Sequence, residues 1–380
     1  MAGKTNIFQP LSVLVGTIIG VGLFSLPYIT VRAGVWTMLG YFLLLGGVTI
    51  LIKLIYGEVI LRTREIHRLP GYVGKYLGAK WKKISFFSNA FGLTGALLAY
   101  LIVGGNFLYS LFSQYFGGSK TFYTLILFAV GACLIYFGIK SISYIESLAL
   151  ILFFVVLFLI FQKGFSLVRI ENFFYFDLKH FFLPYGAILF SLSGTSLIPE
   201  VREMLRNRPQ DLKKVIFWAI AIAVLVYLSF IFIIVGITGQ NATPDAIIGL
   251  RNILNDGLVG LALVFGFLTV FTSLLTIGLT LKKILWYDMG LKENLSWFLA
   301  CFTPLVLFFA GFNNFITVIS LVGGVFLGVD VTLMILIYLK AKKQGDLKPA
   351  YSLNLPRPLI YSLILFFILG AVYEIYYFLA

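Results

Sequence analysis

Apolar residues run through this chain in long stretches separated by short polar segments. Many of these stretches exceed the roughly 18 residues that a helix needs to cross about 30 Å of hydrocarbon. They do not alternate between polar and apolar positions, as the strands of a membrane β-barrel would. The pattern therefore predicts an all-α integral membrane protein with eleven spans, at approximately 8–32, 34–61, 84–113, 121–139, 143–162, 180–204, 213–237, 258–285, 295–311, 314–339 and 358–379.

Composition supports this class of protein. Hydrophobic residues make up 60% of the chain, charged residues only 12%, and the mean hydropathy is +1.00, whereas a soluble domain carries about 25% charged residues. The longest linkers, 62–83, 163–179, 238–257 and 340–357, have room only for short loops and small interfacial helices. The polar segment Met1–Pro10 lacks the features of a cleavable signal peptide, so we expect the first helix to be retained.

The distribution of basic residues predicts the orientation. If the N-terminus lies in the cytoplasm, most of the 29 Lys and Arg residues fall in cytoplasmic segments. The basic residues left on the outer side are Arg32, Lys120, Lys163, Arg169, Lys179 and Arg251. This asymmetry predicts a multi-pass protein of the cell membrane with an extracytoplasmic C-terminus. The net charge of +14 then reflects loops that face an anionic leaflet, and nucleic acid is not needed to explain it.

The first predicted span carries helix-weakening residues at its centre. It contains the run Gly16-Thr17-Ile18-Ile19-Gly20-Val21-Gly22-Leu23-Phe24-Ser25-Leu26-Pro27. Inside a helix, Gly costs about 1 kcal/mol and Pro about 3 kcal/mol relative to Ala. Unwound backbone at membrane depth is tolerated only where it is buried in protein or lines a cavity. The run therefore predicts a broken helix at a ligand site.

The sixth predicted span contains a second break. Its centre, Phe190-Ser191-Leu192-Ser193-Gly194-Thr195-Ser196, is rich in hydroxyls that compete for backbone hydrogen bonds, and Pro199 follows. Each break opens a block of five spans, and an odd number inverts the second block. We therefore expect inverted halves at 1–162 and 163–340, with 341–380 holding a cytoplasmic loop and an extra eleventh helix. Paired broken helices in inverted repeats indicate a secondary transporter with a midplane site. The alternative is that small residues such as Gly16 and Gly20 serve close helix packing.

The breaks favour a zwitterionic ligand, because neither unwound core contains Asp, Glu, Lys or Arg. A carboxylate fits the free N–H groups near Gly20 to Gly22, and an ammonium fits the carbonyls of Ile18 and of Phe190 to Ser193. Phe24, Phe190 and Tyr100 suggest a neutral amino acid with an aliphatic or aromatic side chain, although ordinary packing is the alternative for each ring. The predicted substrate-binding residues are Thr17, Ile18, Gly20, Val21, Gly22, Tyr100, Phe190, Ser191, Ser193, Gly194 and Thr195.

The first-span run resembles the first-helix signature of the hydroxy/aromatic amino acid permeases. That family is grouped with the amino acid/auxin permeases in the amino acid–polyamine–organocation superfamily. Ile198-Pro199-Glu200-Val201 and Thr272-Ser273-Leu274-Leu275-Thr276-Ile277-Gly278-Leu279 resemble the sixth and eighth helices of the group. The resemblance covers the whole topology. It implies a LeuT-like five-plus-five inverted repeat with broken helices 1 and 6, and amino acid uptake coupled to H⁺ or Na⁺, with no other cofactor.

The coupling ion has two sets of candidate residues. By resemblance, sodium would lie between the first and eighth helices at Gly16, Ile19, Thr269, Thr272 and Ser273. The alternative is that the hydroxyls only bond back to their own helix. Sodium-coupled relatives often carry Asn in place of Gly16, and the hydroxy/aromatic permeases are proton-coupled, so the proton is favoured. Titratable candidates within the spans are Asp330, Glu146 and Lys53. A Lys53–Glu146 pair, or snorkelling of Lys53, would instead be structural.

The predicted function is therefore secondary active transport of a neutral amino acid by a monomer in the lipid bilayer. A non-transporting amino acid sensor on the same fold is the main alternative, but it would usually carry a cytoplasmic domain. An enzyme is disfavoured because His67 and His180, the only histidines, are predicted at opposite membrane faces. A channel is disfavoured because channels generally lack paired broken helices in inverted blocks.

Overall fold

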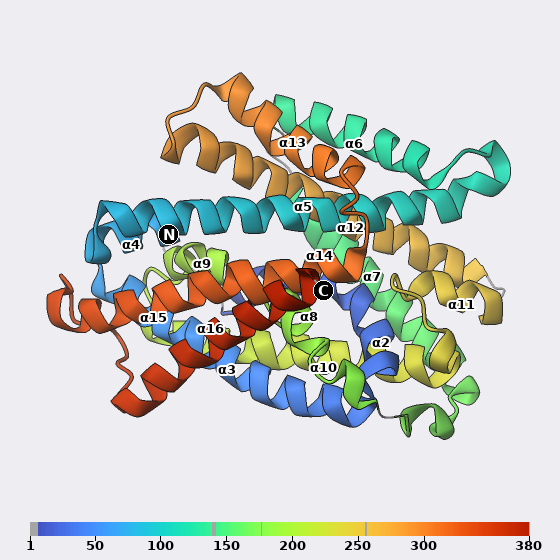
Figure 1. The fold of residues 1–380 in the computed structure, drawn as a ribbon, viewed down its shortest axis with the longest axis horizontal. Helices are drawn as coiled ribbons and strands as arrows, with labels where there is room; N and C mark the ends of the chain where they lie inside the picture. The colour runs from blue at the N-terminus through green and yellow to red at the C-terminus, as the bar shows by residue number, and fades with distance from the viewer. Residues whose placement is uncertain (1–6, 139–141, 176, 255–256, 380) are drawn as a thin grey trace.

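The computed structural model describes residues 7–138, 142–175, 177–254 and 257–379, and these fold into a bundle of helices (Figure 1). In this part of the chain, seven helices are long and apolar enough to cross a membrane. An eighth span is formed by α1 (Phe8–Ile18) and α2 (Gly22–Ala33), whose axes are bent by 53° at a short break. The chain is therefore a multi-span helical membrane protein with a broken first helix, as predicted.

Helical elements occupy every predicted span, with ends within a few residues of those expected. The unbroken ones are α3 (Val35–Arg62), α5 (Ala79–Phe116), α6 (Lys120–Phe137), α7 (Ile142–Gly164), α10 (Leu212–Thr238), α12 (Gly257–Lys283), α13 (Glu293–Phe309) and α16 (Arg357–Leu379). The sixth span is split into α8 (Pro184–Ser191) and α9 (Ile198–Met204). The tenth consists of α14 (Phe315–Leu321), the π-helical turn η8 (Val322–Phe326) and α15 (Leu327–Gln344).

Two linkers contain small helices, in line with the prediction for these segments. They are α4 (Leu69–Leu77) in the first long linker and α11 (Ile247–Leu254) in the third. The second linker contains the short 3₁₀ turns η1 (Phe165–Leu167) and η2 (Ile170–Phe173). A third such turn, η4 (Thr195–Leu197), lies within the second helix break.

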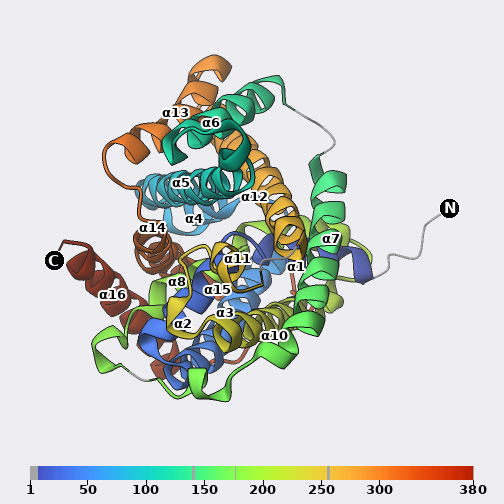
Figure 2. The same ribbon diagram turned by 90° about the vertical axis from the view of Figure 1, so that its right-hand side faces the viewer.

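The spans form two packed groups. In the broken-helix group, α1 and α2 pack on α10, α2 packs on α8, and α3 packs on α8, α9 and α10. In the second group, which we call the crossing group, α5 packs on α6, α12 and α13. Figure 2, viewed along the bundle, shows α1 and α8 near the centre, with α5 and α12 on one side and α3 and α10 on the other. Both breaks are therefore buried between the two groups.

The glycines and serines place the breaks more accurately than the prolines do. The first break covers Ile19 to Val21, so it contains Gly20 and is followed directly by Gly22. At the second, Gly194 has φ +94°, a conformation that only glycine adopts without strain. Pro27, in contrast, lies inside α2, and Pro199 lies in the first turn of α9, where a missing N–H costs little. The expectation that these prolines help to interrupt the helices is therefore wrong.

Candidate functional site

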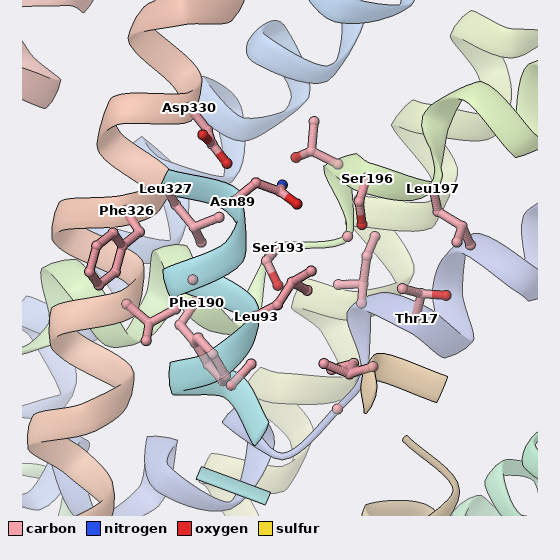
Figure 3. Close-up of a pocket in the computed structure, with 18 of the residues that line it drawn as sticks. Thr17, Asn89, Leu93, Phe190, Ser193, Ser196, Leu197, Phe326, Leu327 and Asp330 are labelled. Atoms are coloured by element: carbon pink, nitrogen blue, oxygen red, sulfur yellow. The ribbon is translucent and has the colours of Figure 1, made fainter. Parts of the chain in front are cut away.

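A cavity of about 260 Å³ lies between the broken-helix group and the crossing group. Both helix breaks line it, together with residues of α3, α5, α12, α15 and α16. Figure 3 shows polar side chains, including Thr17, Ser193 and Ser196, interspersed along its wall with apolar ones, including Leu93 and Leu197. The cavity thus offers both polar and apolar contacts to a single ligand.

All of the residues predicted to bind substrate line this one cavity. They come from α1, from the two breaks, from α2, α8 and η4, and, for Tyr100, from α5. Their role in substrate binding stays a prediction. Phe24, which was expected near the ligand, lies elsewhere: its ring packs edge-on against Phe107 and Phe230, with centroids 5.1 and 6.3 Å away. All three rings are at most 2% exposed, so they close the protein beyond the first break along α2.

At the first break, backbone donors remain available. Among the described residues, the N–H groups of Val21 and Gly22 have no hydrogen-bond acceptor. They stand at the start of α2, where the helix dipole places partial positive charge. A side chain at Gly22 would come within 2.9 Å of the Ser191 Cα, and one at Gly20 would come within 2.6 Å of the Tyr100 hydroxyl. Glycine therefore allows α2 to approach α8 and leaves the amides open to the cavity.

At the second break, backbone acceptors are occupied by a buried cation. Lys53 of α3 is 0% exposed, and its Nζ donates to the carbonyls of Leu192 (2.6 Å) and Ser193 (2.9 Å). These carbonyls follow the C-terminus of α8, where the helix dipole is negative. Lys53 therefore does not snorkel to the membrane surface. Its partners are these carbonyls, and Glu146 of α7 has a side chain that lies outside the described residues.

The remaining carbonyls predicted to hold an ammonium also accept hydrogen bonds. The Tyr227 hydroxyl of α10 lies 2.7 Å from the carbonyls of both Ile18 and Ser191, so it links the two breaks. The Ile18 carbonyl also accepts from Gly20 N–H, and the Phe190 carbonyl accepts from Ser193 N–H. The Phe190 carbonyl also accepts from Leu192 N–H, so of these two carbonyls Ser191 is the one that retains a lone pair for a ligand.

The residues of the implied sodium site lie on α1 and α12. The hydroxyl of Thr269 donates to the Phe265 carbonyl, and that of Thr272 lies within 3.1 Å of the Leu268 and Thr269 carbonyls. This is the local bonding expected under the alternative reading. Ser273 lines the cavity, Ile19 is buried, and Gly16 is partly buried within α1. Hydroxyl and carbonyl oxygens suit a hard cation, so sodium binding by this set stays a prediction.

Of the predicted proton carriers, Asp330 faces the cavity. It lies in the first turn of α15, just after η8, and is 4% exposed. A π-helical turn widens the helix by one residue and is frequent at functional sites. Here the turn brings Gly323 and Gly324 against Gly186 of α8 and Glu374 of α16.

Sequence reasoning missed three polar residues around the site. Asn89 of α5 lines the cavity, and Tyr227 joins the breaks. Glu374 of α16 is 3% exposed and accepts a hydrogen bond from Gly186 N–H (3.1 Å), near the N-terminus of α8. An intramembrane acid in the eleventh span was a usable signal for Glu374. Asn89 and Tyr227 resemble many other polar residues in spans, so no local signal distinguishes them.

Comparisons with known proteins agree with the fold. The structure of MhsT in complex with L-phenylalanine superimposes with a TM-score of 0.68 at 13% identity, covering 98% of both chains. The inward-facing conformation of Mhp1 gives 0.59 at 12% identity, covering 86% of this chain and 76% of Mhp1. These likenesses show a LeuT-like transporter fold. A search of curated proteins finds no match.

The sequence itself matches a family of transporters over almost its whole length. The match to the tryptophan/tyrosine permease family covers residues 4–374, which include both breaks, Lys53 and Asp330. Members of this family are permeases for aromatic amino acids, and transport rather than catalysis is their function. This agrees with the resemblance seen in the first span. The chain belongs to the tryptophan/tyrosine permease family.

Proposed function

We propose that this permease binds one aromatic amino acid in the cavity between its two broken helices and carries it across the cell membrane by alternating access. The observation that supports the proposal is that both breaks and Tyr100 line one cavity of about 260 Å³. Pockets for drug-sized ligands typically measure about 300–1,000 Å³, and this cavity lies just below that range, in keeping with a smaller ligand such as an amino acid.

The substrate contacts follow from the groups that the breaks leave open. The carboxylate accepts hydrogen bonds from the amides of Val21 and Gly22 at the start of α2. The ammonium donates to the remaining lone pair of the Ser191 carbonyl. The aromatic side chain packs against Phe190 and Leu93 of the cavity wall. Lys53 acts as a fixed internal cation that stabilises the second break whether or not substrate is bound.

The orientation inferred from the basic loops indicates on which side of the membrane the cavity opens. It reaches the protein surface at Arg68, whose side chain is 40% exposed, and at the exposed Glu200. Arg68 lies in the linker placed in the cytoplasm, so the cavity opens inward. Phe24, Phe107 and Phe230 close the opposite side. Transport then requires the inverted halves, 1–162 and 163–340, to close this opening and part the aromatic cluster.

We further propose that the monomer transports substrate in symport with a cation, and that this cation is the proton. The decisive experiment is uptake of labelled tryptophan, tyrosine and leucine into proteoliposomes, with a proton gradient and a sodium gradient imposed in turn. We expect tryptophan and tyrosine to accumulate under the proton gradient and leucine to accumulate less. Liposomes without protein and liposomes with Gly22→Val, which fills the space beside Ser191, are the controls. The absence of aromatic amino acid uptake under both gradients would refute the proposed function.

A further inference from the structure

One carboxylate oxygen at the cavity has no partner in the part of the chain that the structure describes. Among the described residues, Oδ1 of Asp330 is buried and makes no hydrogen bond. Asp330 lines the cavity, and Figure 3 shows its carboxylate directed inward, next to the amide of Asn89. An unused buried acceptor costs about 1–3 kcal/mol and more if it is charged, so a ligand that supplies a donor gains by meeting it.

The other charged groups at the cavity are accounted for. Lys53 donates to the Leu192 and Ser193 carbonyls. Arg68 lies 3.4 Å from Asp288, and Glu200 is exposed to solvent. Ser88 and Asn89 of α5 lie close enough to the Asp330 carboxylate to hydrogen-bond to it, and Ser88 also donates to the Phe326 carbonyl at 3.0 Å, but none of these contacts uses Oδ1. Within the described chain, Asp330 is therefore the buried acid that presents an open acceptor to the cavity.

The surroundings of Asp330 indicate which part of a substrate would reach it. The backbone groups suited to the carboxylate and ammonium belong to the breaks, whereas Asp330 is on α15. Figure 3 shows Asp330, Asn89 and the apolar Leu327 together at one end of the wall, with the apolar Leu93 and Phe190 farther along it. A ligand held by its head group at the breaks would extend its side chain along these apolar residues toward the carboxylate.

We propose that Asp330 accepts a hydrogen bond from the far end of the aromatic side chain, that is, from the phenol O–H of tyrosine or the indole N–H of tryptophan. Asn89 completes this subsite, because its amide can donate to the phenol oxygen. The inference rests on the proposed function and adds a specificity determinant to it. A carboxyl group can accept a hydrogen bond whether it is ionised or protonated. A site built for such a donor rejects ligands that lack it, because its polar group is left unpaired.

The test compares pairs of ligands that differ in the donor alone. Equilibrium binding of tyrosine and phenylalanine, and of tryptophan and 1-methyltryptophan, is measured for the purified wild type and for Asp330→Asn and Asp330→Leu. We expect the wild type to bind tyrosine about 10- to 100-fold more tightly than phenylalanine. Asp330→Leu should bring this ratio close to one, and Asp330→Asn should leave it intermediate. Thr332→Val, on the same helix as Asp330 but not among the described residues that line the cavity, should keep the wild-type ratio.

Two results would overturn the inference. The first is equal affinity of the wild type for tyrosine and phenylalanine, a result that requires no variant protein. The second is an unchanged ratio in the Asp330 variants; if those variants also lose proton-driven accumulation, Asp330 carries the proton instead. If the wild type binds none of the aromatic amino acids, the proposed function itself is refuted. This outcome differs from the two results above, in which the wild type still binds aromatic amino acids.

Discussion

The two helix breaks line the same cavity, but the protein satisfies them differently. At the second break, the buried ammonium of Lys53 occupies the Leu192 and Ser193 carbonyls. At the first, the described residues offer no acceptor for the amides of Val21 and Gly22. At the second break, Lys53 therefore occupies the backbone acceptors, whereas at the first break the backbone N–H donors remain available to a ligand. This difference supports our proposal that the anionic end of a substrate lies at the first break, and that the second break mainly supports the site.

The largest expected effect is at Lys53. Lys53→Met removes the donor to two buried carbonyls, and each unsatisfied acceptor costs about 1–3 kcal/mol. We expect a marked fall in the thermal stability of the detergent-solubilised protein and loss of uptake. The exposed Lys213→Met on α10 is the matched control and should leave both unchanged. A stable, active Lys53→Met would show that the second break does not depend on its internal cation.

The next effect is at Gly22, where the first break meets α8. Gly22→Ala forces a shift against Ser191, and overpacking of this kind costs about 1–3 kcal/mol. We expect the dissociation constant for tryptophan to rise at least tenfold. Gly47→Ala on α3, where no atom lies within 4 Å of the added methyl, should bind as the wild type does. Equal affinities of the two variants would mean that this contact does not shape the site.

A smaller effect is expected at Tyr227, which joins the two breaks. Tyr227→Phe keeps the ring and removes the hydroxyl that lies 2.7 Å from the Ile18 and Ser191 carbonyls. Loss of one hydrogen bond corresponds to about 0.5–1.5 kcal/mol, so tryptophan affinity should fall a few-fold. Tyr361→Phe on α16, at a ring that is 60% exposed, is the control. An unchanged affinity would show that the breaks are positioned independently of each other.

The smallest effect is expected at an exposed ion pair whose two residues do not line the cavity. Lys75 of α4 forms an ion pair with Asp346, which follows α15, and this hydrogen bond lowers the pKa of Asp346 below its usual range. Because the pKa of Asp346 is lower in the folded state, the ion pair stabilises the protein at any pH above the ordinary Asp pKa. This stabilisation is lost as the pH falls through the pKa that Asp346 has in the folded state. Asp346→Asn should therefore lower the melting temperature slightly at neutral pH and not at strongly acidic pH. A pH-independent difference would contradict this account. High salt should weaken the effect, because both groups are exposed.

The sequence predicts the spans and both breaks because their signals are local. Apolar runs of membrane length, the glycines around Gly20 and the hydroxyl-rich segment before Pro199 act on the backbone in which they occur. The partners of the breaks are not local. Lys53 lies 139 residues from Leu192, and Glu374 lies 188 residues from Gly186. Such contacts depend on how the helices pack, and a single sequence does not encode that in any neighbouring pattern.

The central claim is that the cavity between the breaks holds an aromatic amino acid with its carboxylate at the first break. The most direct test is an experimental structure of the purified protein with tryptophan bound. The account predicts density for the carboxylate at the amides of Val21 and Gly22, with the indole ring beside Phe190. Tryptophan bound away from the breaks, or with its carboxylate on the Lys53 side, would contradict it.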